Sequence, residues 1–468
     1  MNGEDASYKE MLAPLKLAPF YIFFNHRQML SELRQQGIRE AKKTTANITL
    51  DETLRPLWKL TYYCGILLDW CRPISENDPR FWKATRYLSI VMSSFLLLAV
   101  FTFELAQLFI GIERSLNVHL IILNIVWCIP VMVGVVIQEQ FLRHRREFLG
   151  FFKGWRRVEM EITKLNPDCI MCKSRRMHVV MYAIHGGLAI AGLISIGIDI
   201  FNRPDEPYLI SHYKSVRDLV PLLLICFVHL AAICLTLILL TLSDLVTSFT
   251  YYHAGLAVDC LERDARIVFA RCFNTEDRLF ITSLDDNNQP ENVCKDLPKS
   301  CSSAEIRVSL QLIWARFDNV DQLINQANSL FGKFLVCSQG VSLFMITALL
   351  YSVFYYLGDA LRLRSTGLIL PYVMNFLSLG FRFISSMLIS AQLHRSVGKF
   401  RMSLNYLLSQ HWNQMSKQDR DLLRSFLSRL YTDSLVACPL GLYNITPSIL
   451  LSIIGLVVSY VIVLLQSK

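Results

Sequence analysis

The chain has 468 residues, of which 53% are hydrophobic and only 18% are charged, and its mean hydropathy is +0.36. Soluble domains carry about 25% charged residues, whereas the apolar excess here comes in blocks, as in a polytopic membrane protein. The net charge of +9 lies beside these blocks, so a membrane explains it better than a nucleic-acid partner does.

Seven apolar blocks predict an all-α membrane protein with seven transmembrane helices. At about 1.5 Å per residue, each block can cross a hydrocarbon core of about 30 Å. Pro130 predicts a kink in the second span, and the fourth is expected to continue as helix beyond the membrane. Leu54–Trp70 is apolar but contains three charged residues, which indicates a juxtamembrane or interfacial segment. The predicted spans are 87–110, 117–142, 177–201, 216–241, 334–357, 367–394 and 445–466.

Basic residues in the connections predict the orientation. The segment before the first span has 13 Lys or Arg, and the connections 143–176, 251–333 and 394–445 have 10, 9 and 7. The other three connections together hold five. Because basic residues favour the cytoplasmic side, we expect a plasma-membrane protein with a cytoplasmic N-terminus and an external C-terminus.

The predicted division of the chain follows from these spans. Residues 1–86 form a cytoplasmic N-terminal and juxtamembrane segment, and the spans occupy 87–250, 334–394 and 445–468. Residues 251–333 and 395–444 form cytoplasmic helical extensions, and the turn-rich stretch 274–303 is expected to be disordered.

Two amphipathic helices are predicted in the cytoplasmic extensions. Ile306–Leu330 places apolar residues at steps of three or four and runs directly into the fifth span. Ser416–Leu435 has a second apolar face, with Ser416 as a plausible N-cap and Asp419 in the first turn. Such faces need partners, so we expect a helical anchor below the membrane, formed within one chain or between subunits.

Charged residues inside the spans are unusual. Arg382 lies in the middle of the sixth span, where a charge is costly and faces a partner or a water-filled cavity. Glu139 or Asp244, from the second and fourth spans, could pair with it. A structural role and a role in gating remain alternatives.

Aromatic and polar residues gather in the outer halves of the spans. Aromatic walls with a few polar groups suit a small-molecule pocket, although aromatic residues near an interface are also ordinary membrane anchors. We expect some of this set to bind a ligand. Its members are Asn124, Trp127, His229, Tyr351, Tyr355, Tyr372, Asn375 and Phe376.

Enzymatic and metal chemistry are disfavoured by the motifs. The sequence has no H-E-x-x-H, no P-loop and no GxSxG. Cys169 and Cys172 form a CxxC, but a zinc site needs about four ligands and the nearest other pair, Cys294 and Cys301, lies in the turn-rich stretch. We therefore expect no metal and no cofactor.

The last span carries polar residues among its apolar ones. They are Ser448, Ser452, Ser459, Tyr460 and Gln466. A Gln near the end of a final span indicates a helix–helix contact, a water-filled path or a side chain that reaches the headgroup layer. We interpret this span as a pore-lining helix.

The end of this span resembles the C-terminal signature of insect gustatory receptors: Thr-Tyr, five hydrophobic residues, Gln-Phe. Here it reads Ser459-Tyr460-Val-Ile-Val-Leu-Leu-Gln466-Ser467, with Ser459 in place of Thr and Ser467 in place of Phe. The related odorant receptors and their co-receptor end in a similar Tyr-x-x-Val-x-x-Gln pattern, which Val463 and Gln466 match. G-protein-coupled receptors fit poorly, because the predicted N-terminus is cytoplasmic and the last span lacks NPxxY.

This resemblance implies a homotetrameric, ligand-gated, non-selective cation channel, with the last helix of each copy lining one pore. Val463 and Gln466 would face the pore, and Ser467 would lie beside them at the outer mouth. The ligand would be a small tastant, and heteromers with related receptors are a further option. The alternatives are an odorant receptor or co-receptor channel of the same superfamily, and a non-channel receptor with a cytoplasmic partner. A transporter is disfavoured, since the sequence shows no internal repeat.

Overall fold

The computed structural model describes residues 50–63, 80–113, 118–163, 171–202, 222–273, 303–363, 369–432 and 435–466. Within these ranges the chain is helical and has no strand, which confirms the predicted all-α fold. The helices are α4 (Leu50–Tyr63), α5 (Arg80–Glu113), α6 (Val118–Arg143), α7 (Arg145–Thr163), α8 (Met171–Asn202), α9 (Leu222–Phe273), α11 (Ser303–Leu363), α12 (Leu370–Gln410), α13 (Lys417–Thr432), the short 3-10 helix η3 (Pro439–Gly441) and α14 (Pro447–Gln466).

The seven predicted spans correspond to α5, α6, α8, α9, α11, α12 and α14, with residues 117, 216–221 and 367–368 of those spans outside the described ranges. Among the described residues, four helices contain stretches long and apolar enough to cross a membrane: Met177–Ile194, Leu230–Phe273, Glu305–Tyr355 and Tyr372–Gln410. Two shorter apolar stretches, Tyr87–Phe103 and Pro447–Val463, lie in α5 and α14. Residues 274–302, most of the stretch expected to be disordered, lie outside the described ranges.

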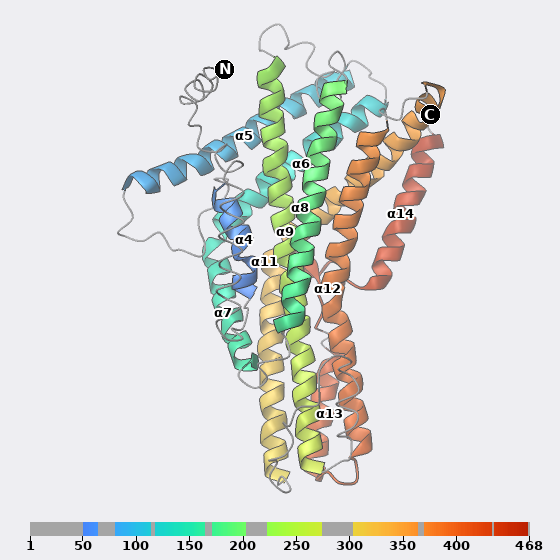
Figure 1. Ribbon diagram of the computed structural model, residues 1–468. Helices are drawn as coiled ribbons and strands as arrows, with labels where there is room; N and C mark the ends of the chain where they lie inside the picture. The colour runs from blue at the N-terminus through green and yellow to red at the C-terminus, as the bar shows by residue number, and fades with distance from the viewer. Residues whose placement is uncertain are drawn as a thin grey trace, which may run out of the picture.

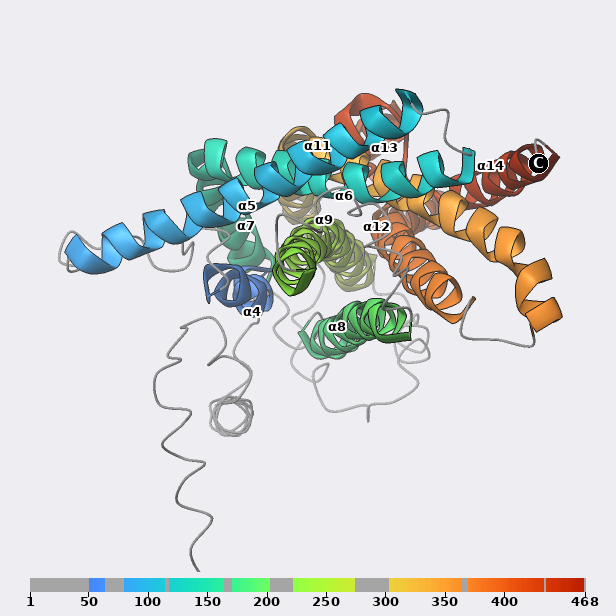
Figure 2. The ribbon, with the colours of Figure 1, turned by 90° about the horizontal axis from the view of Figure 1, so that it is seen from above.

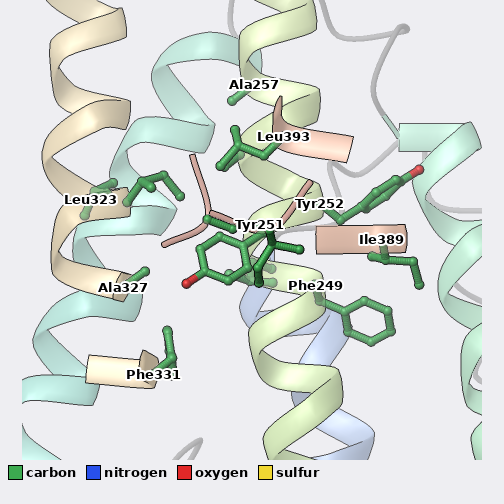
Figure 3. Packing of buried hydrophobic residues seen from close by; sticks show 14 of the residues in the cluster. Phe249, Tyr251, Tyr252, Ala257, Leu323, Ala327, Phe331, Ile389 and Leu393 are labelled. Atoms are coloured by element: carbon green, nitrogen blue, oxygen red, sulfur yellow. The ribbon is translucent and has the colours of Figure 1, made fainter. Parts of the chain in front are cut away.

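Helix α9 is the centre of the molecule. From above, α5 and α6 lie along one side of it and α8 lies on the other (Figure 2). Every residue from Leu242 to Gly255 is buried. Figure 3 shows part of the reason: Tyr251 of α9 lies among apolar side chains of α11 and α12, such as Ala327 and Leu393.

Two helices are much longer than a bilayer is thick. Helix α9 has 52 residues and α11 has 61, so at about 1.5 Å per residue they reach about 78 and 92 Å, against a hydrocarbon core of about 30 Å. Both therefore continue far beyond any membrane they cross. This confirms that the fourth span continues as helix, and that the amphipathic stretch 306–330 runs unbroken into the fifth.

The long helices form a bundle at the lower end of the molecule in Figure 1. We define the lower bundle as residues 245–273 of α9, 303–332 of α11, 395–410 of α12 and all of α13. The apolar face of α13 is buried in it, and Phe426 stacks on Trp314 of α11 with ring centroids 5.2 Å apart. Each such buried side chain stabilises the fold by about 1.5–3 kcal/mol. The partner that the amphipathic pattern required is thus found within the same chain.

Ion pairs and a helix cap complete the docking of α13. Arg429 contacts Asp321 of α11 at 3.0 Å, and Arg307 of α11 contacts Asp419 at 3.2 Å. The Asp419 backbone N–H donates to the Ser416 hydroxyl at 3.2 Å, so Ser416 caps the helix as its sequence position predicted.

Two helices add to the sequence-based expectation. In the connection after α6, which its basic residues marked only as cytoplasmic, the described residues form the 19-residue helix α7, whose Phe148, Phe151 and Trp155 are buried. Residues 54–63 of the segment expected to be juxtamembrane or interfacial belong to α4, which packs on α7 and α9 with Leu50 and Leu54 fully buried, and residues 64–70 lie outside the described ranges. Both helices join the core because their apolar residues recur at helical spacing.

Candidate functional site

Helix α14 has one face packed against its own chain. It lies at the margin of the helix array in both ribbon views (Figures 1 and 2) and contacts α11 and α12. Val457 and Val461, four residues apart and therefore on one face, are the buried residues of this helix within the described side chains. Ile449, Leu450, Ile453 and Leu465 are partly buried beside them. Most of the other described side chains of α14 are exposed in the single chain, and Leu451 is 73% exposed.

The opposite face carries a polar stripe. Its members are all exposed: Ser448, Ser452, Gly455, Ser459, Ile462 and Gln466. The steps of four and three place them along one side of the helix at about 100° per residue, turned away from Val457 and Val461. The Ser459 hydroxyl donates to the Gly455 carbonyl at 2.9 Å. The stripe combines hydroxyl groups, an amide and one aliphatic side chain.

The residues predicted to line a pore lie on or beside this stripe. Gln466 belongs to it, and Val463 is 59% exposed on its flank. Tyr460 is 57% exposed and lies further around the helix, so that Val463 falls between Tyr460 and the stripe. Ser467 lies outside the described residues. Sequence reasoning did not single out Ile462, which falls on the stripe one helical turn before Gln466; its spacing from Ser459 was the available signal.

Three of the predicted ligand residues, Tyr372, Asn375 and Phe376, lie where α12 meets α8 and α11. On α11 the rings of Tyr351 and Tyr355 are 5.9 Å apart. On α12 Tyr372 is buried against Leu349 of α11, and Phe376 packs against this pair. Leu349 and Val353 form the α11 side of this contact. Tyr351 and Tyr355 each follow one of them by two residues, about 200° around the helix, so the two tyrosines lie on the opposite face of α11.

Helix α8 closes one side of the contact between α11 and α12. Gly192 lies so near α12 that a Cβ atom there would be 3.3 Å from Oδ1 of Asn375. One turn further along α12, the Ser378 hydroxyl donates to the Leu188 carbonyl at 3.0 Å. Polar atoms of Asn375 and Ser378 are thus set beside the aromatic side chains. We call these parts of α8, α11 and α12, centred on Gly192, Leu349 and Tyr372, the aromatic junction.

The remaining predicted ligand residues cannot be assigned to the aromatic junction. Asn124 and Trp127 lie on α6 and His229 lies on α9, but their side chains are not among those described. Sequence reasoning missed Leu349, Val353 and Leu379, which pack with Tyr372 and Phe376. Leu379 follows Asn375 and Phe376 by four and three residues, which was an available signal, whereas Leu349 and Val353 lie two residues from the predicted tyrosines and so on another face of α11.

Arg382 is buried and paired. Its Nε lies 2.8 Å from Oδ2 of Asp244 on α9, and both side chains are about 95% buried. From α11, Ser338 donates to Asp244 at 2.5 Å and Ser342 accepts from Nη2 of Arg382 at 3.3 Å. The pair therefore joins three helices.

Of the two candidate partners for Arg382, Glu139 was the wrong one. It lies on the surface of α6, where its side chain is 49% exposed and pairs with Arg143 one turn later at 3.5 Å. An exposed position costs a carboxylate no desolvation, so nothing drives Glu139 into the core.

The sequence of the chain matches a known family of proteins. A sequence profile described as 7tm Chemosensory receptor matches residues 54–468. The chain belongs to this family. The predicted resemblance to insect chemoreceptors is thereby confirmed at the level of the superfamily.

Solved structures show the same fold as this receptor. The olfactory receptor OR5 of Machilis hrabei in complex with eugenol aligns with a TM-score of 0.56 at 13% identity, over 90% of this chain and 98% of that one. A second structure of the same olfactory receptor gives 0.54 at 12% identity, over 90% and 99%. No curated protein sequence matches the chain.

Proposed function

We propose that this receptor is a ligand-gated, non-selective cation channel of the gustatory type. It would lie in the plasma membrane with its N-terminus and lower bundle in the cytoplasm, and a small tastant would open it. Four copies would place their α14 helices around one pore, as homotetramers or as heteromers with related receptors. This assignment rests on the C-terminal signature, on the family and on the two-faced last helix.

The observation that carries the channel proposal is the opposition of the two faces of α14. Val457 and Val461 attach the helix to its own chain, so the stripe from Ser448 to Gln466 points away from it. In a symmetric assembly of copies, a face turned away from each subunit can meet the common axis. Serine hydroxyls and a glutamine amide there would be wetted by water instead of being buried in lipid.

The residues at the end of the stripe suit a gate. A ring of aliphatic side chains can close a pore by excluding water, and a ring of neutral amides gives little charge selectivity. Ile462 or Val463 would supply the first ring and Gln466 the second. The expected pore is therefore permeable to several cations.

The aromatic junction is the proposed ligand region. Tyr372 and Phe376 supply aromatic surface, and Asn375 supplies hydrogen-bonding atoms, which together suit a polar tastant. Tyr351 and Tyr355, on the opposite face of α11, remain proposed ligand residues outside this junction. A ligand opens the channel if it binds the open arrangement more tightly than the closed one. A ligand at this junction would contact α11 and α12 directly.

An odorant-sensing channel is the second candidate. The packing of Leu349, Tyr372 and Phe376 is almost entirely apolar, and an apolar wall would accept a volatile compound. The solved structures similar to this chain are olfactory receptors. The two candidates share the pore and differ in the ligand.

Patch recording tests the proposal. We expect the full-length protein, expressed alone, to give currents evoked by sucrose or caffeine, whereas a response to eugenol alone favours the odorant alternative. Gln466→Arg adds one positive charge per subunit and should lower cation conductance at least tenfold. Each charge at about 5 Å costs a cation about 0.8 kcal/mol in water, so four cost about 3 kcal/mol before screening by salt. Gln418→Arg, the same change on the exposed side of α13, is the control and should have no effect.

The pore assignment fails if evoked currents are unchanged by Gln466→Arg. If cells expressing the protein respond to a ligand but the purified protein shows no unitary currents, the non-channel receptor that signals through a cytoplasmic partner is supported instead.

A further inference from the structure

The chain enters α14 through a short, folded segment. We call residues 435–446 the linker; it contains η3 and connects α13 to α14. Ile445 donates its backbone N–H to the Ala437 carbonyl at 2.8 Å, which closes the linker into a loop. Leu440 adopts a left-handed conformation with φ of 53°, and Gly441 follows with φ of 71°. A non-glycine residue in this conformation costs free energy and persists only where its surroundings hold it.

Asn328 of α11 holds the first part of the linker. Its Oδ1 accepts from the Cys438 backbone N–H at 3.1 Å, and its Nδ2 donates to the Val436 carbonyl at 3.2 Å. Tyr251 of α9 donates its hydroxyl to the same Oδ1 at 2.8 Å, which fixes the orientation of the amide. One side chain thus satisfies linker groups of both polarities, where unpaired buried groups would be costly.

The linker also touches the backbone of α11. A Cβ atom at Gly332 would lie 2.6 Å from the Leu440 backbone nitrogen, and real side chains do not approach that closely. Gly332 therefore allows the strained residue of the linker to rest directly on the helix. This contact lies one helical turn after Asn328.

Gln339 of α11 holds the last part of the linker. Its Oε1 accepts a hydrogen bond from the Tyr443 hydroxyl, and its Nε2 lies 3.0 Å from the sulfur of Met387 on α12. Burial, with a smaller effect of Cys438, raises the pKa of Tyr443 to about 12. The hydroxyl therefore remains protonated, and able to donate, throughout the physiological pH range.

The same helix connects this attachment to the aromatic junction. Gln339 follows Ser338, which binds Asp244 of the buried ion pair. Ten residues further along, Leu349 of the aromatic junction lies about 15 Å away on the same continuous helix. No Pro interrupts α11 between Gln339 and Leu349, so a displacement of the helix at Leu349 can be passed on to Gln339.

We propose that Asn328 and Gln339 are positioning residues that fix where α14 begins, so that displacement of α11 moves the pore-lining helix through the linker. The pore part of this inference rests on the proposed channel function. The attachment itself does not, because it follows from the contacts of Asn328, Gly332 and Gln339 with the linker.

Hydrogen exchange of the full-length protein in lipid nanodiscs tests the attachment. We compare the wild type with Tyr443→Phe, Gln339→Met and the double variant, which remove one or both partners of the Tyr443–Gln339 bond. Amides of residues 442–450 should exchange about five- to tenfold faster in each single variant. The double variant should be no faster than the single variants, because both remove the same bond.

Tyr431→Phe is the matched control. The Tyr431 hydroxyl accepts a hydrogen bond from Asn405 at 2.7 Å, so the variant also breaks a tyrosine–amide contact, but one between α12 and α13. It should leave exchange in residues 442–450 unchanged. Exchange at 442–450 that stays at the wild-type rate in both single variants overturns the proposal, and so does acceleration spread equally over α12 and α13.

Single-channel recording tests the consequence for gating, with sucrose, caffeine and eugenol as probes. Tyr443→Phe should change the open probability at least threefold and leave unitary conductance unchanged, because the stripe on α14 is intact. A merely structural contact would lower the number of channels but not the open probability of each one, so an unchanged open probability overturns the gating role. If the wild type conducts with none of these probes, the channel proposal loses its support, while the exchange result still decides whether the residues position α14.

Discussion

Arg382 holds three helices together through a single side chain. It binds Asp244 of α9 and Ser342 of α11 from its own position on α12. A buried charge is strongly destabilising once its partner is removed, although a well-packed apolar pair can replace the whole ion pair at little cost. The pair therefore makes the relative positions of these helices specific.

Substitution of one partner should show this asymmetry. Asp244→Ala leaves the Arg382 guanidinium buried without a carboxylate and should lower the free energy of unfolding by about 3–5 kcal/mol. The double variant Asp244→Leu with Arg382→Met should recover most of the loss. The measurement is the melting temperature of the solubilised protein by fluorescence-detected size exclusion.

Glu139→Ala is the control for this comparison. Its exposed pair with Arg143 contributes about 0–1 kcal/mol at most, so the melting temperature should hardly change. Equal losses for Asp244→Ala and Glu139→Ala would show that the buried pair has no special role.

At this scale the sequence predicted the unusual residue but not its surroundings. A charge in a span indicated that Arg382 needs a partner, and the choice between Glu139 and Asp244 needed the rotation of α6 and α9 about their axes. Ser338 and Ser342 carried no signal of their own, because serine is common in apolar helices and is satisfied there by its own backbone.

Helix α11 serves three regions of the molecule in one element. Its first half packs in the lower bundle, its middle binds the linker and its far end reaches the aromatic junction. The sequence predicted its amphipathic stretch and its continuity with the fifth span. It did not predict the linker contacts, because an asparagine and a glycine on a helix face do not indicate which other segment of the chain packs against them.

Two glycines of α11 give a test of the close contact. Gly332→Ala should destabilise the protein by about 1–3 kcal/mol, since the new methyl group would overlap the Leu440 backbone. Gly340→Ala should instead stabilise it by up to about 1 kcal/mol, because a Cβ there meets no atom within 4 Å and alanine favours helix. Melting temperatures of the two variants should move in opposite directions, and a fall of the same size in both would contradict the contact.

Helix α7 carries two signals in one stretch of sequence. Its basic residues indicate the orientation in the membrane, and the spacing of its apolar residues indicates a helix. Its buried residues Phe148, Phe151, Phe152 and Trp155 are separated by one, three or four residues, which was sufficient to predict an amphipathic helix.

At the scale of the whole molecule, α14 is the element that a single chain leaves incomplete. Most of its apolar surface has no partner in the chain, and Leu451, Tyr460 and Val463 are each more than half exposed. Composition and periodicity predicted a spanning helix here, and the signature supplied the family. The number of copies around a pore could not follow from one chain, because it depends on contacts between chains.

Counting subunits tests the assembly directly. With a fluorescent protein fused to the N-terminus, single complexes in a membrane should bleach in up to four steps, because four α14 helices are proposed to surround one pore. Complexes that bleach in only one or two steps would contradict the tetramer. Gln466→Arg should bleach in the same number of steps, since the charge lies on the stripe and not on the packed face with Val457 and Val461.

The burial of α9 has a consequence for how such receptors can diverge. A substitution between Leu242 and Gly255 meets packed side chains in every direction, so nearly every change there lowers stability. On α11 and α12, by contrast, exposed residues such as Phe354, Met374 and Leu377 lie close in sequence to those of the aromatic junction and can change at small cost. With the ligand bound at this junction, as we propose, a lineage descended from this receptor could acquire new ligands by mutation there while inheriting the central helix almost unaltered.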